Sequence, residues 1–86
     1  MMMKELLDLY LLDKTASGVS PLTVEYYRVS VDKFIRFAGN IPADDLTLLK
    51  IKQYILYLQS QDINSVSVRT YARGFRVFVS WLVEIA

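Results

Sequence analysis

Residues 64–81 read NSVSVRTYARGFRVFVSW, and this stretch decides the fold of the last third of the chain. At about 3.6 residues per helical turn, its apolar side chains and those just beyond gather on one stripe. That stripe consists of Val68, Tyr71, Ala72, Phe75, Phe78, Val79 and Leu82. A second stripe consists of Arg69, Arg73, Arg76 and Ser80. The pattern predicts an amphipathic helix over residues 65–84, capped by Asn64 or Ser65, with its apolar stripe facing a core.

The arginine stripe is a local charge asymmetry. The whole chain has 10 basic and 9 acidic residues and a formal net charge of +1. A stripe whose charged residues are all positive, in a nearly neutral chain, favours an anionic partner, and nucleic acid is the first candidate. The alternative is that the arginines are solvated and cover apolar surface with their stems.

The composition limits the possible function classes. The chain has 86 residues, of which 53% are hydrophobic, so we expect one folded domain over residues 1–86. It contains no cysteine and no histidine. Disulfides, thiolate or imidazole metal sites and imidazole-based catalysis are therefore excluded, and we expect no metal, no cofactor and no catalytic residue.

The N-terminal segment is apolar but does not read as a membrane or export signal. Lys4, Glu5 and Asp8 interrupt the stretch from Met1 to Leu12, and no small-residue cleavage site follows it. We therefore expect a cytoplasmic protein with no membrane partner.

Three further helices are predicted before residue 64. The first ends at Gly18, the second starts with Ser20 as cap and Pro21 as its first residue, and the third starts at Thr47. Together the predicted helices span residues 3–17, 21–38, 47–60 and 65–84. Since the connections are short, we predict an all-α, compact four-helix bundle.

Two of these helices carry their own apolar stripes. In the 21–38 helix the stripe consists of Val24, Tyr27, Val31, Phe34, Ile35 and Ala38. In the 47–60 helix it consists of Leu48, Ile51, Tyr54, Ile55 and Leu58. Gly74 lies inside the last helix, where glycine costs about 0.8 to 1 kcal/mol relative to alanine. We expect a neighbouring helix to approach closely there.

The 21–38 helix has two polar surfaces. One alternates in sign and predicts internal ion pairs; it consists of Glu25, Arg28, Asp32 and Arg36. The other suits contacts to phosphates and base edges; it consists of Thr23, Tyr26, Ser30 and Lys33. Both this helix and the last one start with hydroxyl-rich turns, and helix starts attract phosphate. The two starts therefore predict two prongs of one phosphate-binding surface.

Several groups of residues follow one another in a familiar order. They are Gly18-Val19-Ser20; Thr23 with Tyr27-Arg28; Phe34 with Phe37; Leu46-Thr47 with Ile51, Tyr54-Ile55 and Leu58; and Ser67-Val68 with Tyr71, Arg73, Phe75-Arg76, Phe78 and Trp81-Leu82-Val83-Glu84. This order resembles the N-terminal SAM-like, core-binding domain of tyrosine recombinases, which include the phage and mobile-element integrases. Two positions depart from the family pattern, since Ser67 stands where threonine is usual and Tyr26 where a smaller polar residue is common.

The resemblance implies a SAM-like bundle that forms one jaw of a clamp around duplex DNA. It implies DNA contacts from the second and fourth helices, to the core site where strands are exchanged in integration and recombination. Together with the polar helix starts, it assigns as DNA-facing residues Ser20, Thr23, Tyr26, Arg28, Lys33, Ser65, Ser67, Arg69 and Arg73. Arg76 lies beside the phenylalanine positions, and we expect it to serve packing or a domain contact.

The resemblance also bears on catalysis and partners. The family's catalytic arginines, lysine, histidines and tyrosine lie in a C-terminal domain that would begin after Ala86. We therefore expect this chain to bind DNA without cutting it. Its expected partners are double-stranded DNA, the catalytic domain of the same parent chain and neighbouring recombinase protomers on DNA.

The competing hypothesis is a helical protein–protein interaction module without DNA binding. It would dock a partner through Val77, Val83 and Tyr57, which this hypothesis expects to be exposed. Its binding would be insensitive to salt.

Overall fold

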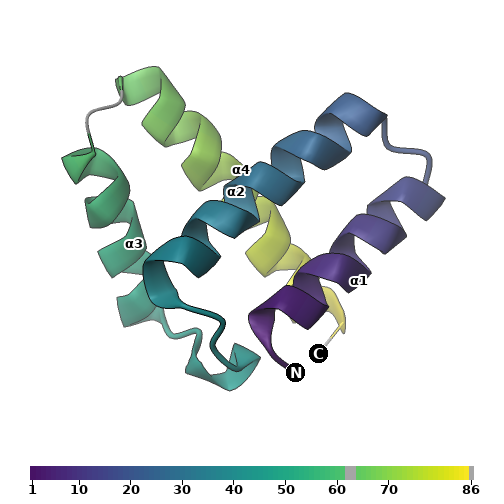
Figure 1. Ribbon diagram of the computed structural model, residues 1–86, viewed down its shortest axis with the longest axis horizontal. Helices are drawn as coiled ribbons and strands as arrows, with labels where there is room; N and C mark the ends of the chain where they lie inside the picture. Colours follow the sequence, from purple (N-terminus) through teal and green to yellow (C-terminus); the bar gives the residue numbers. More distant parts are fainter. Residues whose placement is uncertain (62–63, 86) are drawn as a thin grey trace.

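The computed structural model of the chain describes residues 1–61 and 64–85. In these residues the chain forms four α-helices and one short 3-10 turn (Figure 1). The elements are α1 (Met3–Ala16), α2 (Pro21–Ala38), η1 (Ala43–Asp45), α3 (Leu48–Ser60) and α4 (Ser65–Ile85). The predicted all-α, four-helix fold is confirmed, and each predicted helix end lies within one residue of the observed one.

Local hydrogen bonds explain why the helices start where they do. Ser20, Thr47 and Asn64 each accept a hydrogen bond with a side-chain oxygen from the backbone N–H three residues later, at 3.3, 3.2 and 2.8 Å. The sequence left Asn64 and Ser65 as candidate caps of the last helix, and the structure shows that Asn64 caps α4. Gly18 and Gly39 end the chain's first two helices with φ of 85° and 86°, a conformation that glycine adopts without a steric cost.

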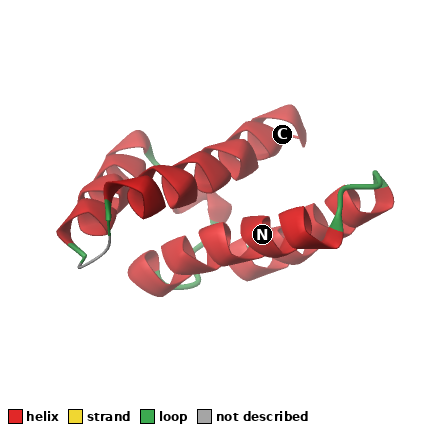
Figure 2. Cartoon of the chain, turned by 90° about the horizontal axis from the view of Figure 1, so that it is seen from above, coloured by secondary structure: helices red, strands yellow, loops and turns green. Residues whose placement is uncertain are grey.

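The helices form two layers. The α1–α2 hairpin is one layer, and α4 with α3 is the other (Figure 2). α2 crosses α4 near the middle of the molecule, with α1 and α3 on opposite sides of the crossing (Figure 1). None of the helices in the described residues combines the length and apolarity needed to cross a bilayer.

Aromatic rings fill the space between the layers. At the crossing, the ring of Phe34 stacks on that of Phe75 at 4.5 Å, and the ring of Tyr54 meets both edge-on at 5.2 Å. Further along α4, Tyr10 of α1 packs against Phe78 and Trp81. The core thus joins all four helices through rings spaced along α4.

Gly74 lies at the α2–α4 crossing. A Cβ atom on Gly74 would lie 2.2 Å from the Oγ atom of Ser30, so the predicted close approach is confirmed. Ser30 is fully buried there and donates a hydrogen bond to the carbonyl of Tyr26 at 2.8 Å. The prediction that Ser30 lies on an exposed polar strip is wrong, because α4 covers that part of α2.

Two other residues depart from the predicted stripes. Leu48 is 67% exposed, because α3 buries Tyr54 and Leu58 in its later turns while its first residue stays outside the core. Trp81 is buried although the predicted stripe left it out. Its indole N–H donates to the carboxylate of Asp13 at 3.1 Å, which connects the end of α4 to α1.

We expect Tyr10→Phe to raise the free energy of unfolding by about 1 kcal/mol, because it removes a buried polar group without a partner. Within the described residues, the Tyr10 hydroxyl is buried and has no hydrogen-bond partner, and burial raises the pKa of that phenol. The ring contacts with Phe78 and Trp81 would remain. Urea unfolding followed by circular dichroism measures the change.

Tyr26→Phe is the matched control, because the Tyr26 hydroxyl donates to the carbonyl of Thr70. We expect this second variant to lose about 1 kcal/mol. A Tyr10→Phe variant that is destabilised as much as Tyr26→Phe would mean that the Tyr10 hydroxyl has a partner in solution.

Candidate nucleic-acid interface

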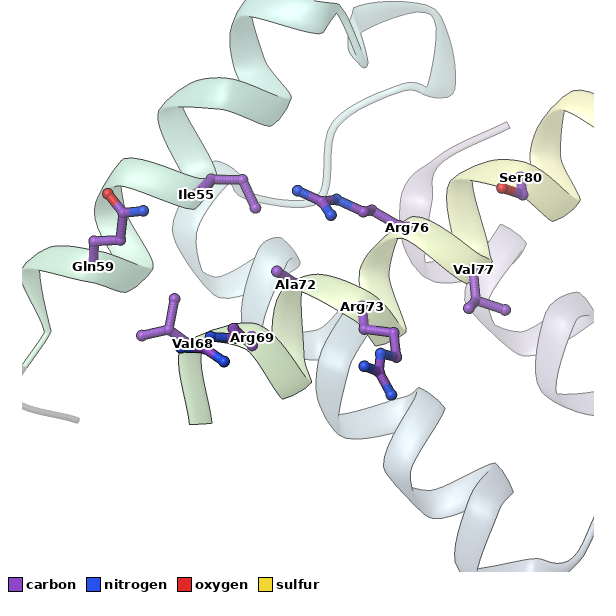
Figure 3. A pocket seen from close by; sticks show the side chains of 9 residues that line it. All are labelled: Ile55, Gln59, Val68, Arg69, Ala72, Arg73, Arg76, Val77 and Ser80. Atoms are coloured by element: carbon purple, nitrogen blue, oxygen red, sulfur yellow. The ribbon is translucent and has the colours of Figure 1, made fainter. Parts of the chain in front are cut away.

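The exposed arginines of α4 lie along a groove between α3 and α4, which we call the arginine groove (Figure 3). It has a volume of about 440 Å³. Its lining residues are Ile55 and Gln59 of α3, and Val68, Arg69, Ala72, Arg73, Arg76, Val77 and Ser80 of α4. Aliphatic side chains from both helices thus lie beside three guanidinium groups.

Within residues 1–61 and 64–85, the three arginines of this groove make no ion pair. In the described parts of the chain, ion pairs join only Arg28 to Glu25 and Arg36 to Asp32, both within α2. Arg69, Arg73 and Arg76 are all exposed. The predicted second stripe of α4 is therefore confirmed as a solvent-facing surface.

Arg76 belongs with the other two arginines. It is exposed and does not pack in the core, so the packing role predicted for it is wrong. The predicted domain contact is untested. In Figure 3 its guanidinium extends toward Ile55 on α3, whereas that of Arg73 points away from Ile55. The position of Arg76 along the helix suggested a role different from that of Arg69 and Arg73, but in the structure all three residues lie on one face of α4.

The two layers differ in charge. Helices α3 and α4 carry five basic residues and a single acidic one, Glu84. Residues 1–47, which contain α1, α2 and η1, carry five basic and seven acidic residues. The near-neutral total therefore hides a positive α3–α4 layer, whereas α1 and α2 together carry five basic and five acidic residues and the two remaining acids, Asp44 and Asp45, belong to η1.

A second groove separates the starts of α2 and α4, and we call it the helix-start groove. Its volume is about 360 Å³. Its lining residues are Leu22, Glu25, Tyr26 and Val29 of α2, and Ser67, Thr70 and Tyr71 of α4. The structure therefore brings Tyr26 and Ser67, two predicted DNA-facing residues, to one groove. The hydrogen bond from Tyr26 to the Thr70 carbonyl holds the two helices together there.

The other hydroxyl residues lie near these grooves. Ser20 is exposed and donates to the Oγ1 atom of Thr23 at 3.0 Å, while Thr23 is half-buried. Ser65 is exposed and lines a shallow hollow with Gln59 and Arg69. The start of α4 thus continues into the arginine groove.

Arg28 and Lys33 line neither groove, but each contacts a residue that lines the helix-start groove. The Nε atom of Arg28 donates to Glu25 Oε2 at 2.9 Å, and this hydrogen bond holds the pKa of the Glu25 carboxyl below its usual value. Arg28 lies about 160° around α2 from Ser30, on the side turned away from α4. The Nζ atom of Lys33 lies 4.5 Å from the centre of the Tyr71 ring, in a cation–π contact. The predicted pairing along the Glu25 to Arg36 face is confirmed.

The sequence did not indicate any role for α3 in this surface. Gln59 and Ile55 form one wall of the arginine groove, yet neither carries a charge; Gln59 belongs to no motif, and Ile55 was predicted only as part of the apolar stripe and of the family order. Only the packing of α3 beside α4 brings these residues next to the arginines.

Comparison with known protein families gives one match, over residues 6–86, to the model described as phage integrase, N-terminal SAM-like domain. The match confirms the resemblance seen in the order of residues. No curated protein and no solved structure matches the chain significantly.

Proposed function

Because this chain belongs to the family of phage integrase N-terminal SAM-like domains, we propose that it is the DNA-binding module of a site-specific tyrosine recombinase. In this proposal it grips the duplex of the core site through α4 and the start of α2. Its parent protein breaks and rejoins DNA during integration or recombination, whereas this module binds and does not cut. Its partners are duplex DNA, the parent's catalytic domain and neighbouring protomers.

The arginine groove is the observation that carries the proposal. Arg69, Arg73 and Arg76 project from one face of α4 in the positive layer of the molecule. Duplex DNA carries one negative charge per about 1.7 Å of its axis, so a row of cations along a helix can meet several phosphates. Guanidinium groups also bind phosphate oxygens in pairs, which fixes the orientation of the helix.

The hydroxyl groups at the two helix starts supply the second part of the interface. Ser20 and Thr23 lie at the start of α2, and Ser65 and Ser67 lie in the first turn of α4. Hydroxyls and helix starts bind phosphate oxygens without bringing in another full charge. In this proposal Tyr26 braces the groove between the two starts, because its hydroxyl already binds Thr70. Arg28 and Lys33 contribute at the edge of the interface.

Titration of the isotopically labelled domain with duplex DNA, followed by NMR, tests this proposal. At about 20 mM salt, where charges are weakly screened, we expect the amide signals of residues 65–76 and 20–26 to move most. Signals from η1 should move least, because η1 contributes no residue to the arginine groove or the helix-start groove. If the helix-start and arginine-groove signals stay in place at saturating DNA, the proposal fails.

We expect Glu25→Gln to strengthen DNA binding by about two- to threefold at low salt, because it removes an anion that would face phosphate. Glu25 lines the helix-start groove and holds Arg28 in an ion pair. The substitution would also free the Arg28 guanidinium. Fluorescence anisotropy with a labelled duplex measures the change.

Asp32→Asn is the matched control for this prediction. It makes the same change in net charge and frees Arg36 on the same helix, but Asp32 does not line the helix-start groove. Its effect on DNA binding should be smaller. Equal gains in DNA affinity from the two substitutions would mean that net charge, and not the position of Glu25 in the helix-start groove, determines the effect.

A further inference from the structure

The outer face of α1 is amphipathic and uncovered. Glu5, Asp8, Leu9 and Leu12 are spaced by three and four residues, so they share one side of the helix. All four are exposed, and Leu9 and Leu12 keep 43% and 67% of their surface accessible. This face offers two aliphatic side chains beside two carboxylates.

The arginine groove has the complementary chemistry. Its wall is aliphatic, with Ile55, Val68 and Val77 among its lining residues, and its three arginines are unpaired in the described parts of the chain. Duplex DNA alone would use the arginines and leave these aliphatic side chains without a partner. An amphipathic helix laid in a groove uses both kinds of contact.

A copy of the protein cannot fill its own groove with its own α1. Helices α1 and α3 lie on opposite sides of the molecule, with α2 and α4 between them (Figure 1). The acidic helix therefore faces away from the basic groove of the same copy. A second copy can present its α1 to that groove.

We propose that α1 of one copy docks in the arginine groove of a second copy. Leu9 and Leu12 lie against the aliphatic wall, and Glu5 and Asp8 face the arginines. Because the two surfaces differ, the contact is head to tail and leaves one α1 and one groove free in each pair. The contact does not depend on the DNA-binding proposal, but both use Arg69, Arg73 and Arg76, so DNA and a second copy compete for this groove.

Sedimentation velocity at about 20 and 300 mM salt tests the contact, since ionic pairs at a surface weaken as the screening length shortens. We expect concentration-dependent association at low salt and a monomer at high salt. A monomer at both salt concentrations, up to millimolar protein, would overturn the proposal.

Two variants then locate the surfaces. Asp8→Lys reverses a charge on α1, and Arg73→Glu reverses one in the groove; each alone should weaken association at least about tenfold, as expected when like charges meet. Asp45→Lys makes the same charge change as Asp8→Lys, but Asp45 lies in η1 and belongs to neither surface, so this variant should associate like the native protein. Equal weakening by Asp8→Lys and Asp45→Lys would assign the effect to net charge and overturn the contact.

Mixing the two deficient variants gives the sharpest test. In a mixture, the intact α1 of Arg73→Glu meets the intact groove of Asp8→Lys, so one-to-one complexes should form again. A symmetric contact between like surfaces would not recover in this way, and a mixture that stays monomeric would overturn the head-to-tail arrangement.

DNA titration separates this contact from the proposed function. Asp8→Lys should bind duplex DNA at least as tightly as the native protein, whereas Arg73→Glu should bind it more weakly. Failure of DNA binding in the native protein, together with recovery in the mixture, would refute the DNA proposal and leave the contact between copies standing.

Discussion

Replacing Arg69 and Arg73 together by alanine should weaken binding to duplex DNA by about 10- to 100-fold at low salt, because two phosphate contacts are lost. The slope of log affinity against log salt concentration should fall by up to about two, since each contact releases about 0.9 counterion. Both side chains are exposed and make no ion pair in the described residues, so the fold should remain. Fluorescence anisotropy over a range of salt concentrations measures both quantities.

A second double variant is the control for net charge. Lys4→Ala with Arg36→Ala removes the same number of cations from the α1–α2 layer, and neither residue lines the arginine groove. We expect it to change the affinity only slightly. If the folded Arg69 and Arg73 variant keeps the native affinity and salt slope, α4 is not part of the interface. Salt-insensitive binding to a protein partner would then favour the interaction-module hypothesis. Of the three residues that this hypothesis expects to be exposed, Val83 is 72% and Tyr57 37% exposed, whereas Val77 is half-buried because it packs against the core.

Gly74→Ala should lower the free energy of unfolding by about 2 to 3 kcal/mol, even though alanine is the better helix former by about 1 kcal/mol. The new Cβ would lie 2.2 Å from Ser30 Oγ and 2.7 Å from Ser30 Cβ, so α2 and α4 would have to move apart. Such a shift would loosen the contact between the Phe34 and Phe75 rings at the same crossing. Urea unfolding measures the loss.

A double-mutant cycle with Ser30→Gly identifies the cause. Ser30→Gly alone should cost about 1 kcal/mol through helix propensity, and more through its lost hydrogen bond to Tyr26. In the double variant Ser30→Gly with Gly74→Ala, the Ser30 atoms that would collide with the new Cβ are absent. The double variant should therefore lose less stability than the sum of the two single losses, by at least about 1 kcal/mol. Strict additivity would show that the crossing does not limit residue 74.

The helices themselves were predictable because their causes are local. The start of α2 follows from Ser20 and Pro21, whose effects act within one helical turn. The division of α4 into an apolar and an arginine face follows from its spacing alone, and the structure confirms it. The family resemblance also depended only on the order of residues, and the match over residues 6–86 confirms it.

The assignment of polar faces was less predictable. Thr23, Tyr26, Ser30 and Lys33 share one polar strip by spacing, but α4 packs against this strip, buries Ser30 and engages the hydroxyl of Tyr26. Periodicity shows that a helix has a polar face; it does not show which neighbour covers it. Arg76 illustrates the reverse case, since Phe75 and Phe78, one and two positions away, are buried while the side chain of Arg76 is exposed.

By itself, the sequence determined four helices, their ends, the arginine stripe and the family. Only the tertiary structure decided that α3 forms the second wall of the arginine groove, that Gly74 meets Ser30, and that the excess positive charge of α3 and α4 gathers in one layer. The physical reason is the range of the interactions. Caps and periodicity act within a few residues, whereas grooves and crossings arise from side chains that the chain brings together from positions 9 to 44 residues apart.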